Sequence, residues 1–400
     1  MKTDTKNTWL NSTVIGSSIT SFLSDFGHEV VTVFLSSFLI MIGAPVYALG
    51  LIEGVSDGLS SSVKLLSGYY SDKIGKRKEF ATLGYIATGV FPAIVAVAVS
   101  WPVVLFGRAF GWFGRGIRGP PRDTILANSV EKKNLGKAFG FHRAGDTLGA
   151  IAGPLAAAYL VTSGFELREI FWLAVIPGLL AIFAFWFMVK DKKQASVQSN
   201  KSFVLSLKGL PSRFKSFTVA VLIFGIADFS HTLLIFYAVT NLTPSMGFTN
   251  AAAIGALLYL IRNIVYALAS YPFGVLGDRF GLRRMLAFGY ALAVFTFIGF
   301  IFAPPNILVY GLLFALAGAF IAAEDALEGA ASGELVREKE RGLGYGVLAT
   351  ANGMGDFASS IIVSTLWALF GFPAGFVFSA VVATIGTGTL LWANHNAKPN

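Results

Sequence analysis

Four arginines in one apolar stretch are the residues of this chain best suited to bind an anion. Arg108, Arg115, Arg118 and Arg122 fall within roughly an 80° arc of a helix with 3.6 residues per turn. Arginine makes planar, bidentate contacts with carboxylate and phosphate groups. The spacing therefore predicts that at least one of Arg115, Arg118 and Arg122 contacts a substrate or a gate. The alternative is that part of this stripe balances structural carboxylates.

A stretch of opposite charge lies in the second half of the chain. It contains Glu324, Asp325 and Glu328, and the two glutamates are one helical turn apart on the same face. A buried carboxylate without a cation either takes a partner from elsewhere or remains protonated. We therefore predict that these residues form gating ion pairs across the two halves or carry a proton.

Two histidines recur beside acids. Asp25, His28 and Glu29 share one helix face, and Asp228 and His231 repeat two of these residue types in the second half. Histidine titrates near neutral pH and suits a proton relay, so these residues are candidates for proton coupling. A purely structural hydrogen bond between histidine and aspartate is the alternative.

The composition indicates which elements must position these groups. Of 400 residues, 54% are hydrophobic and 13% are charged, about half the charged share of an ordinary soluble domain. A disordered chain and a water-soluble globule are both excluded. The net charge of +9 does not predict a nucleic-acid binder, because long apolar runs separate the basic clusters. The absence of cysteine excludes disulfides and thiol chemistry. The chain is therefore predicted to be an integral membrane protein.

Twelve stretches are long and apolar enough to cross a bilayer, which takes about 20 residues per helix. They lie near residues 15–41, 46–70, 79–99, 102–129, 136–162, 168–189, 216–242, 250–276, 284–303, 306–332, 341–369 and 372–393. The longest polar connection, 190–215, is predicted to be a cytoplasmic linker between a first six-helix bundle over 1–189 and a second over 216–400. No stretch resembles a signal peptide, so the first span is expected to be retained.

Charge also predicts the orientation of the spans. The even-numbered connections are basic and the odd-numbered ones are almost free of Lys and Arg, so both termini are expected to be cytoplasmic in a cell membrane. Within spans three, six, nine and twelve, the segments that contain no Asp, Glu, Lys or Arg are Phe80–Val99, Ile170–Val189, Met285–Ala303 and Phe372–Ala393. We expect these four helices to face lipid and the other eight to surround a polar interior.

The two halves of the chain repeat a loop motif. It comprises Gly68, Asp72, Gly75 and Arg77 after span two, and Gly274, Asp278, Gly281 and Arg283 after span eight. The loop glycine suits a tight reversal that requires a positive φ. Two parallel six-helix repeats with a site near the membrane midplane are one plan of secondary transporters.

These motifs resemble those of the major facilitator superfamily. The repeated loop matches the signature of that family, and Arg108 with the glycines after it is similar to its pattern in span four. In span five, Gly140, Gly149, Gly153 and Pro154 follow the spacing of the antiporter motif of the family. The resemblance implies an all-α membrane protein with twelve transmembrane helices in two pseudo-symmetric six-helix bundles, of the proton-antiporter or drug-efflux-like branch. It also implies that the repeated loops act as conformational latches, whereas a role in topology alone is the alternative.

The resemblance implies a secondary active transporter that works by alternating access. The glycine pattern favours proton-coupled efflux of a small organic solute, whereas the arginine stripe favours proton-coupled uptake or exchange of a small anion. A channel or a lipid scramblase is the alternative from a different class. No catalytic motif, phosphate-binding loop or metal-ligand cluster occurs in the sequence, so neither an enzyme activity nor a cofactor is predicted. The expected partners are the solute, protons and the bilayer, and the chain is expected to be a monomer.

Overall fold

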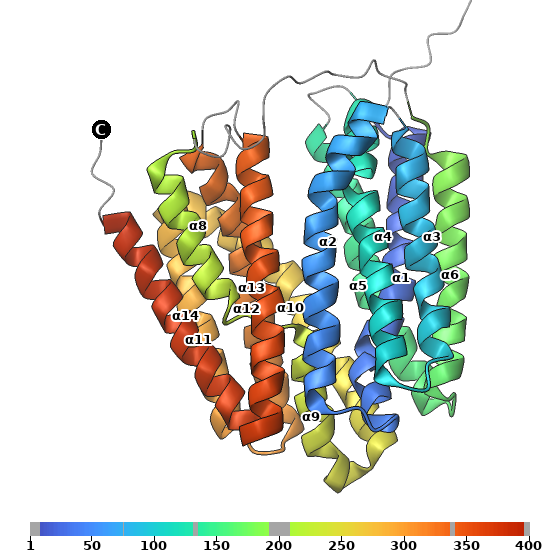
Figure 1. Cartoon of the computed structure of the whole chain (residues 1–400), viewed down its shortest axis with the longest axis vertical. Coiled ribbons are helices and arrows are strands. Elements are labelled where there is room, and N and C mark those ends of the chain that lie inside the picture. Colours follow the sequence, from blue (N-terminus) through green and yellow to red (C-terminus); the bar gives the residue numbers. More distant parts are fainter. Residues whose placement is uncertain (1–8, 75, 131–134, 192–208, 337–340, 396–400) are drawn as a thin grey trace, which may run out of the picture.

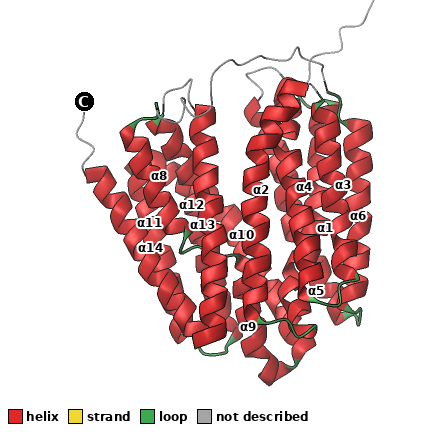
Figure 2. Cartoon of the chain, viewed as in Figure 1, coloured by secondary structure: helices red, strands yellow, loops and turns green. Residues whose placement is uncertain are grey.

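The computed structural model of the chain describes residues 9–74, 76–130, 135–191, 209–336 and 341–395. Every regular element in these ranges is a helix, and short loops join the helices (Figure 2). The helices are α1 (Ser12–Met41), α2 (Val46–Ile74), α3 (Arg77–Ala96), α4 (Trp101–Asn128), α5 (Leu135–Thr162), α6 (Leu167–Met188), α8 (Ser212–Gly225), α9 (His231–Met246), α10 (Phe248–Phe280), α11 (Leu282–Phe302), α12 (Ile307–Leu335), α13 (Arg341–Phe370) and α14 (Phe372–His395).

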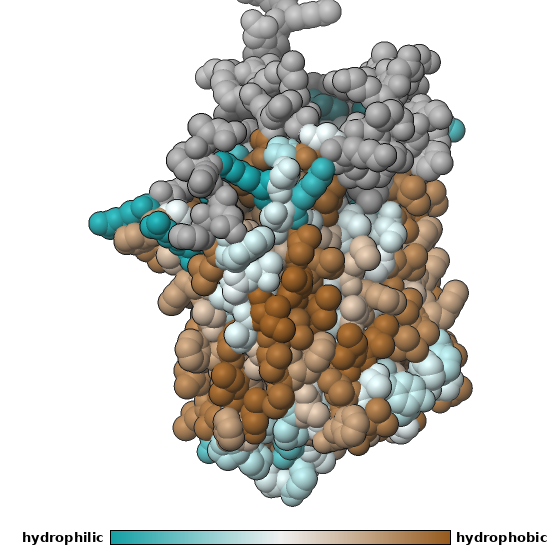
Figure 3. Space-filling model, turned by 60° about the vertical axis from the view of Figure 1, so that its left-hand side comes forward, coloured by the Kyte–Doolittle hydropathy of each residue, from teal (hydrophilic) through white to brown (hydrophobic). Residues whose placement is uncertain are grey.

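These helices make the twelve predicted membrane crossings. In the described part of the chain, nine helices are long and apolar enough to cross a membrane on those criteria alone. Two more, α2 and α4, have 29 and 28 residues but are more polar, and α8 and α9 follow one another along the remaining crossing. Figure 3 shows the consequence on one face, where apolar side chains form a broad band between more polar ends.

The seventh crossing is not the continuous helix that the sequence predicted. The chain leaves the helical conformation at residues 226–230, between α8 and α9. Side chains of α13 satisfy backbone groups that a continuous helix would have paired. The Ser359 hydroxyl donates to the carbonyl of Asp228 at 2.7 Å, and the backbone N–H of Ser230 donates to the Ser360 hydroxyl at 3.1 Å. The break therefore depends on a neighbouring helix.

The helices form two bundles with matching internal packing (Figure 1). In the first, α1 packs on α5 and α6, α2 on α4, and α3 on α4 and α6; in the second, α8 packs on α13 and α14, α10 on α12, and α11 on α12 and α14. The bundles meet along α2 with α13 and α5 with α10, while α9 contacts α1. The two pseudo-symmetric bundles are thus confirmed. Residues 192–208 lie outside the described ranges, and α8 begins within the predicted 190–215 linker, so that boundary stays a prediction.

Glycines bring α5 against the helix that carries the first acid–histidine cluster. A Cβ on Gly149 would lie 2.6 Å from the carbonyl oxygen of Phe22, and one on Gly153 would lie 2.8 Å from the Cβ of Glu29. Such distances are too short for side chains to occupy, so only glycine permits this approach. Gly140 and Pro154 also lie in α5. The glycine pattern of span five therefore serves the packing of α5 on α1 in this structure.

The repeated loops lie at one end of the molecule, which we call the basic end: the end where α2 stops and α3 begins. α1 starts and α14 finishes at this same end (Figure 1). Gly281 joins α10 to α11 with a φ of 98°, the conformation predicted for the loop glycine. Its counterpart Gly75 lies outside the described residues. The other motif residues sit at the adjoining helix ends: Gly68 and Asp72 in α2, Arg77 in α3, Gly274 and Asp278 in α10, and Arg283 in α11.

Candidate functional site

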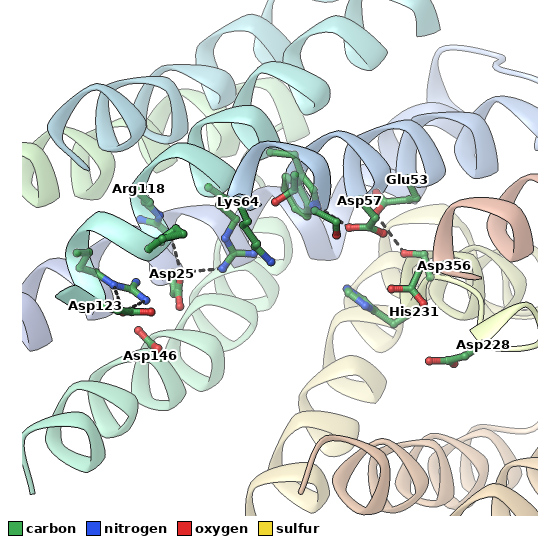
Figure 4. Close-up of a pocket in the computed structure, with 18 of the residues that line it drawn as sticks. Asp25, Glu53, Asp57, Lys64, Arg118, Asp123, Asp146, Asp228, His231 and Asp356 are labelled. Atoms are coloured by element: carbon green, nitrogen blue, oxygen red, sulfur yellow. Dashed lines mark hydrogen bonds and ion pairs between the residues drawn. The ribbon is translucent and has the colours of Figure 1, made fainter. Parts of the chain in front are cut away.

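A cavity of about 650 Å³ lies between the two bundles and is lined mainly by charged side chains (Figure 4). Of the described residues that line it, none comes from α3, α6, α11 or α14, as the absence of charge in those helices predicted. The ionisable residues that line it are Asp25, Glu53, Asp57, Lys64, Arg115, Arg118, Arg122, Asp123, Arg143, Asp146, Asp228, His231, Arg262 and Asp356. Apolar contributions are few and include Trp112 and Phe229.

The cavity is open towards the basic end. Arg143 and Asp123, near the basic ends of α5 and α4, are 79% and 44% exposed, whereas Glu53 deep in α2 is only 1% exposed. A smaller space of about 530 Å³ lies at the opposite end, between the α5–α6 connection and the start of α10. The two spaces are lined by different residues.

Arg108 is removed from the cavity and belongs to a buried ion pair. Its Nε and Nη2 donate to the two carboxylate oxygens of Glu53 at 3.1 and 3.2 Å, and its Nη1 donates to the Thr32 hydroxyl at 2.8 Å. The guanidinium also lies 3.5 Å from the ring centroid of Trp112 and is fully buried. Three of its five N–H donors are therefore occupied, and it does not line the cavity, so this arginine follows the structural alternative of the predicted stripe.

Two of the other arginines line the cavity and share one acceptor. Arg115 Nη2 and Arg118 Nη2 donate to Asp25 Oδ1 at 2.9 and 3.4 Å. Arg115 also contacts His28 Nε2 at 3.2 Å, and Arg118 donates to the hydroxyl of Ser24. Asp25 and His28 of the predicted coupling cluster are therefore engaged by the arginine stripe, all within the first bundle.

Nearer the basic end, ion pairs also hold Arg122 and Arg143 of the first bundle. Arg122 donates to Asp123 Oδ1 at 2.9 Å from Nη2. Arg143 Nη1 donates to Asp146 Oδ2 at 3.4 Å, and His142 lies 3.8 Å from the same carboxylate. Arg143 and Asp146 also line the cavity.

The other wall of the cavity is acidic and less well paired. Asp57 accepts from the indole N–H of Trp112 at 2.6 Å. Asp228, in the helix break, and Asp356, in α13, point into the space in Figure 4, and neither carboxylate forms a hydrogen bond with a side chain of the described residues. Lys64 lies between the two walls in this view and likewise has no ion-pair partner there.

A layer of contacts between the bundles closes the deep end of the cavity. The Ser230 hydroxyl donates to Glu53 Oε2 at 3.2 Å and so joins the helix break to α2. The ring of His231 stacks on Tyr259 at 4.7 Å. Tyr259 in turn lies beside Glu29 of α1, whose Oε2 is buried without a partner among the described residues. Glu29 therefore lies at a contact between α1 and α10.

The three acids of α12 do not line this cavity. Glu328 accepts hydrogen bonds from the Tyr290 hydroxyl at 2.5 Å and from Asn352 Nδ2 at 2.7 Å. Asp325 accepts from the hydroxyl of Tyr266 at 2.8 Å. Glu324 is buried, with Oε2 unpaired among the described residues. In this conformation neutral donors of the second bundle, rather than arginines of the first, bind these acids, so their predicted gating role stays a prediction.

Several lining residues were not among the predicted site residues. Four of them were known from the sequence only as charged residues within predicted spans: Asp57, Lys64, Arg262 and Asp356. They could have been selected because each lies in a span with charged residues whose counterpart in the other half is also charged. Trp112 follows Arg108 by one helical turn, which was the signal for its place beside the arginines.

Comparison with known proteins decides the family. The family model described as Major Facilitator Superfamily matches residues 10–262 and 232–400. The chain belongs to the major facilitator superfamily. An MFS-type transporter of Methanocaldococcus jannaschii is 32% identical over 93% of this chain and 92% of its own length. This superfamily member is therefore a multi-pass membrane transporter and not an enzyme.

More distant similarities agree with the fold of the superfamily. Multidrug resistance protein MdtG of Escherichia coli is 23% identical over 95% of this chain and 93% of its own length. The structure of nucleoside transporter NupG superposes with a TM-score of 0.79 at 15% identity, covering 96% of this chain and 99% of that one. A bacterial homologue of the lysosomal transporter Spinster, solved in an inward-facing and occupied conformation, gives a TM-score of 0.77 at 16% identity, with 96% of both chains covered.

Proposed function

We propose that this superfamily member is a proton-coupled exporter of a small, charged organic solute, working by alternating access. The observation that carries the proposal is the charged cavity between the two bundles, which is open towards the basic end and closed at its deep end. A charged solute needs charged or polar partners to leave water, and this lining supplies both signs. The loop charges predict that the basic end is cytoplasmic, which suits loading of an exported solute from inside.

Glu29 is the residue we propose for proton coupling. It is buried at the contact between α1 and α10, and the unpartnered oxygen Oε2 leaves it free to take up a proton. Rocking of the bundles would separate it from Tyr259 and expose it to water. Asp25 and His28 adjoin it through Arg115, and Asp228 and His231 lie in the facing half, so these four residues form the rest of the proposed coupling cluster.

The proposed gates are the contacts between the bundles at the two ends of the molecule. The hydrogen bond between Ser230 and Glu53 joins the bundles at the closed end and must break for the cavity to open there. At the basic end, the repeated loops would latch the bundles when the opposite conformation forms. The acids of α12 and the arginines of α4 would then meet as that end closes.

The second candidate is proton-coupled uptake or exchange of a small anion. Arg115, Arg118 and Arg122 in the lining favour it. Asp25 and Asp123 neutralise these arginines in part, so the charge that they offer to an anion is smaller than the stripe suggests. A channel or scramblase has less support, because the hydrogen bond between Ser230 and Glu53 joins the two bundles at the deep end of the cavity.

Flux measurements in proteoliposomes test the proposal. Purified full-length protein is reconstituted with a pH-sensitive dye inside, and a panel of labelled organic solutes is screened for saturable exchange. We expect solute efflux to be accompanied by proton entry and to follow an imposed pH gradient. Solute flux that ignores the gradient would refute proton antiport, and large unitary currents would refute a carrier.

A variant of the coupling residue sharpens this test. Glu29→Gln is expected to retain solute exchange without a gradient but to lose proton-driven flux, because glutamine cannot release a proton. Glu328→Gln tests the acid of α12 in the same assay. Ser62→Ala is the control, since Ser62 is exposed on α2 and its hydroxyl bonds only to the Gly58 carbonyl in the same helix. Proton-driven flux through Glu29→Gln at the control rate would remove this residue from the mechanism.

A further inference from the structure

The charges that line the cavity balance in number but not in position. Six basic and seven acidic residues face it, and Glu53 is neutralised by Arg108 from outside the lining. What remains is six charges of each sign. The first bundle supplies five of the six bases and four of the six remaining acids, whereas the second supplies Arg262, Asp228 and Asp356. The chamber is therefore close to neutral overall but has a basic and an acidic side.

On the basic side, Lys64 is the cation that no ion pair with a described residue neutralises. The three arginines of α4 that line the cavity each contact a carboxylate, whereas Lys64 has no ion-pair partner among the described residues and is exposed to the space. Its strongest electrostatic neighbour is another cation, Arg115. Two neighbouring cations repel each other, so an anionic group placed between them would be stabilised by both.

On the acidic side, Asp356 and Asp228 are the carboxylates without an ion-pair partner among the described residues. The strongest electrostatic neighbours of Asp356 are the acids Asp57 and Asp228, and Lys64 acts on it from beyond ion-pair distance. Only Arg262 opposes Asp228 directly. Carboxylates that repel one another and face an aqueous chamber favour a cation between them. Figure 4 shows this group on the opposite side of Lys64 from Asp25 and Arg118.

We propose that the solute is a zwitterion, with its anionic group held by Lys64 and Arg115 and its ammonium group held by Asp228 and Asp356. The inference rests on the proposed transport function and names its substrate class. A simple anion would satisfy Lys64 and leave the acids unpaired, and a simple cation would do the reverse. Few apolar residues line the 650 Å³ chamber, which disfavours an uncharged drug-like compound. Amino acids, short peptides and amino phosphate esters fit this chemistry.

Matched probes test the charge requirement on the purified full-length protein. β-Alanine, alanylalanine and phosphoethanolamine present both charges at different spacings. Each is compared by calorimetric titration with a form that lacks the cation, by N-acetylation, and with one that lacks the anion, by amidation or by use of ethanolamine. We expect at least one zwitterion to bind, and removal of either charge to weaken binding by about tenfold or more.

Two variants test which side of the cavity binds each charged group of the solute. Lys64→Gln should abolish the advantage of the free anionic group over its capped form, while the requirement for the ammonium group persists. Asp356→Asn should do the opposite. Ser62→Ala, on the same helix as Lys64 but outside the cavity lining, should match the wild type. Equal losses for both capped forms in both variants would contradict the assignment even if zwitterions bind.

The outcome separates this inference from the transport proposal. If proteoliposomes exchange a simple anion or cation saturably and none of the three zwitterions binds, the transporter stands and the zwitterion is wrong. Absence of saturable exchange for every solute, with zwitterions bound, would instead refute alternating-access transport. Equal affinity for a zwitterion and either capped form also overturns the inference.

Discussion

Replacement of Arg108 by glutamine should destabilise the protein strongly without a direct effect on solute recognition. The substitution leaves Glu53 buried, with its carboxylate facing a site that held a guanidinium at 3.1 Å. Removing one partner of a buried ion pair costs about 3 to 5 kcal/mol, because the remaining charge is left uncompensated. Both side chains are 1% exposed or less, so solvent does little to reduce this cost.

The reverse change and the double variant measure the pair itself. Glu53→Gln should cost a similar amount, since it leaves Arg108 with Thr32 as its only hydrogen-bonded side chain. In the double variant two amides face each other, and its loss should be smaller than the sum of the single losses by about 0.5 to 3 kcal/mol. The assay is the free energy of unfolding in detergent by denaturant titration, with Arg108→Lys as an intermediate case.

One result would refute the structural assignment of this arginine. If Arg108→Gln unfolds at the free energy of the wild type and yet fails to bind the transported solute, the guanidinium serves the solute and not Glu53. Additive losses in the double variant would also contradict a coupled pair.

Three further predictions use the same unfolding assay. Gly149→Ala should destabilise by about 1 to 3 kcal/mol, because its Cβ would overlap the backbone of α1; Gly388→Ala, where nothing lies within 4 Å, should instead gain up to about 1 kcal/mol from helix propensity. Tyr290→Phe should cost about 1 to 3 kcal/mol, since buried Glu328 loses a donor, and a neutral result would contradict that hydrogen bond. Arg143→Gln should change stability by less than about 1 kcal/mol, because the Arg143 side chain is largely exposed to solvent.

The sequence predicted the architecture well because hydrophobic length and charge placement act locally. Spans without charged residues became α3, α6, α11 and α14, and none of the residues that line the described cavity comes from them. Each of these inferences needed only the residues of one segment and the energetic cost of placing charge in lipid.

The break in the seventh crossing could not be predicted from the same information. Its sequence, from Asp228 to His231, has a counterpart from Asp25 to His28, and that counterpart lies inside the continuous helix α1. Local propensity is therefore similar at the two places. The difference comes from two serines of α13 that bond to the backbone of the break, far away in sequence. The same holds for Glu328, whose partners are neutral side chains on other helices.

Glu53 makes one long-range contact that stabilises its own bundle and another that joins the two bundles. Within its own bundle it is held by Arg108 through a bidentate ion pair whose disruption costs about 3 to 5 kcal/mol. Across the bundles it accepts one hydrogen bond, from Ser230, and a hydrogen bond to a charged group contributes about 1.5 to 3 kcal/mol. When the bundles separate at this end, the weaker contact breaks first, and Glu53 remains with α4. Arg108 thus keeps the carboxylate in place while Ser230 leaves, so that opening the chamber exposes an acceptor that is already positioned.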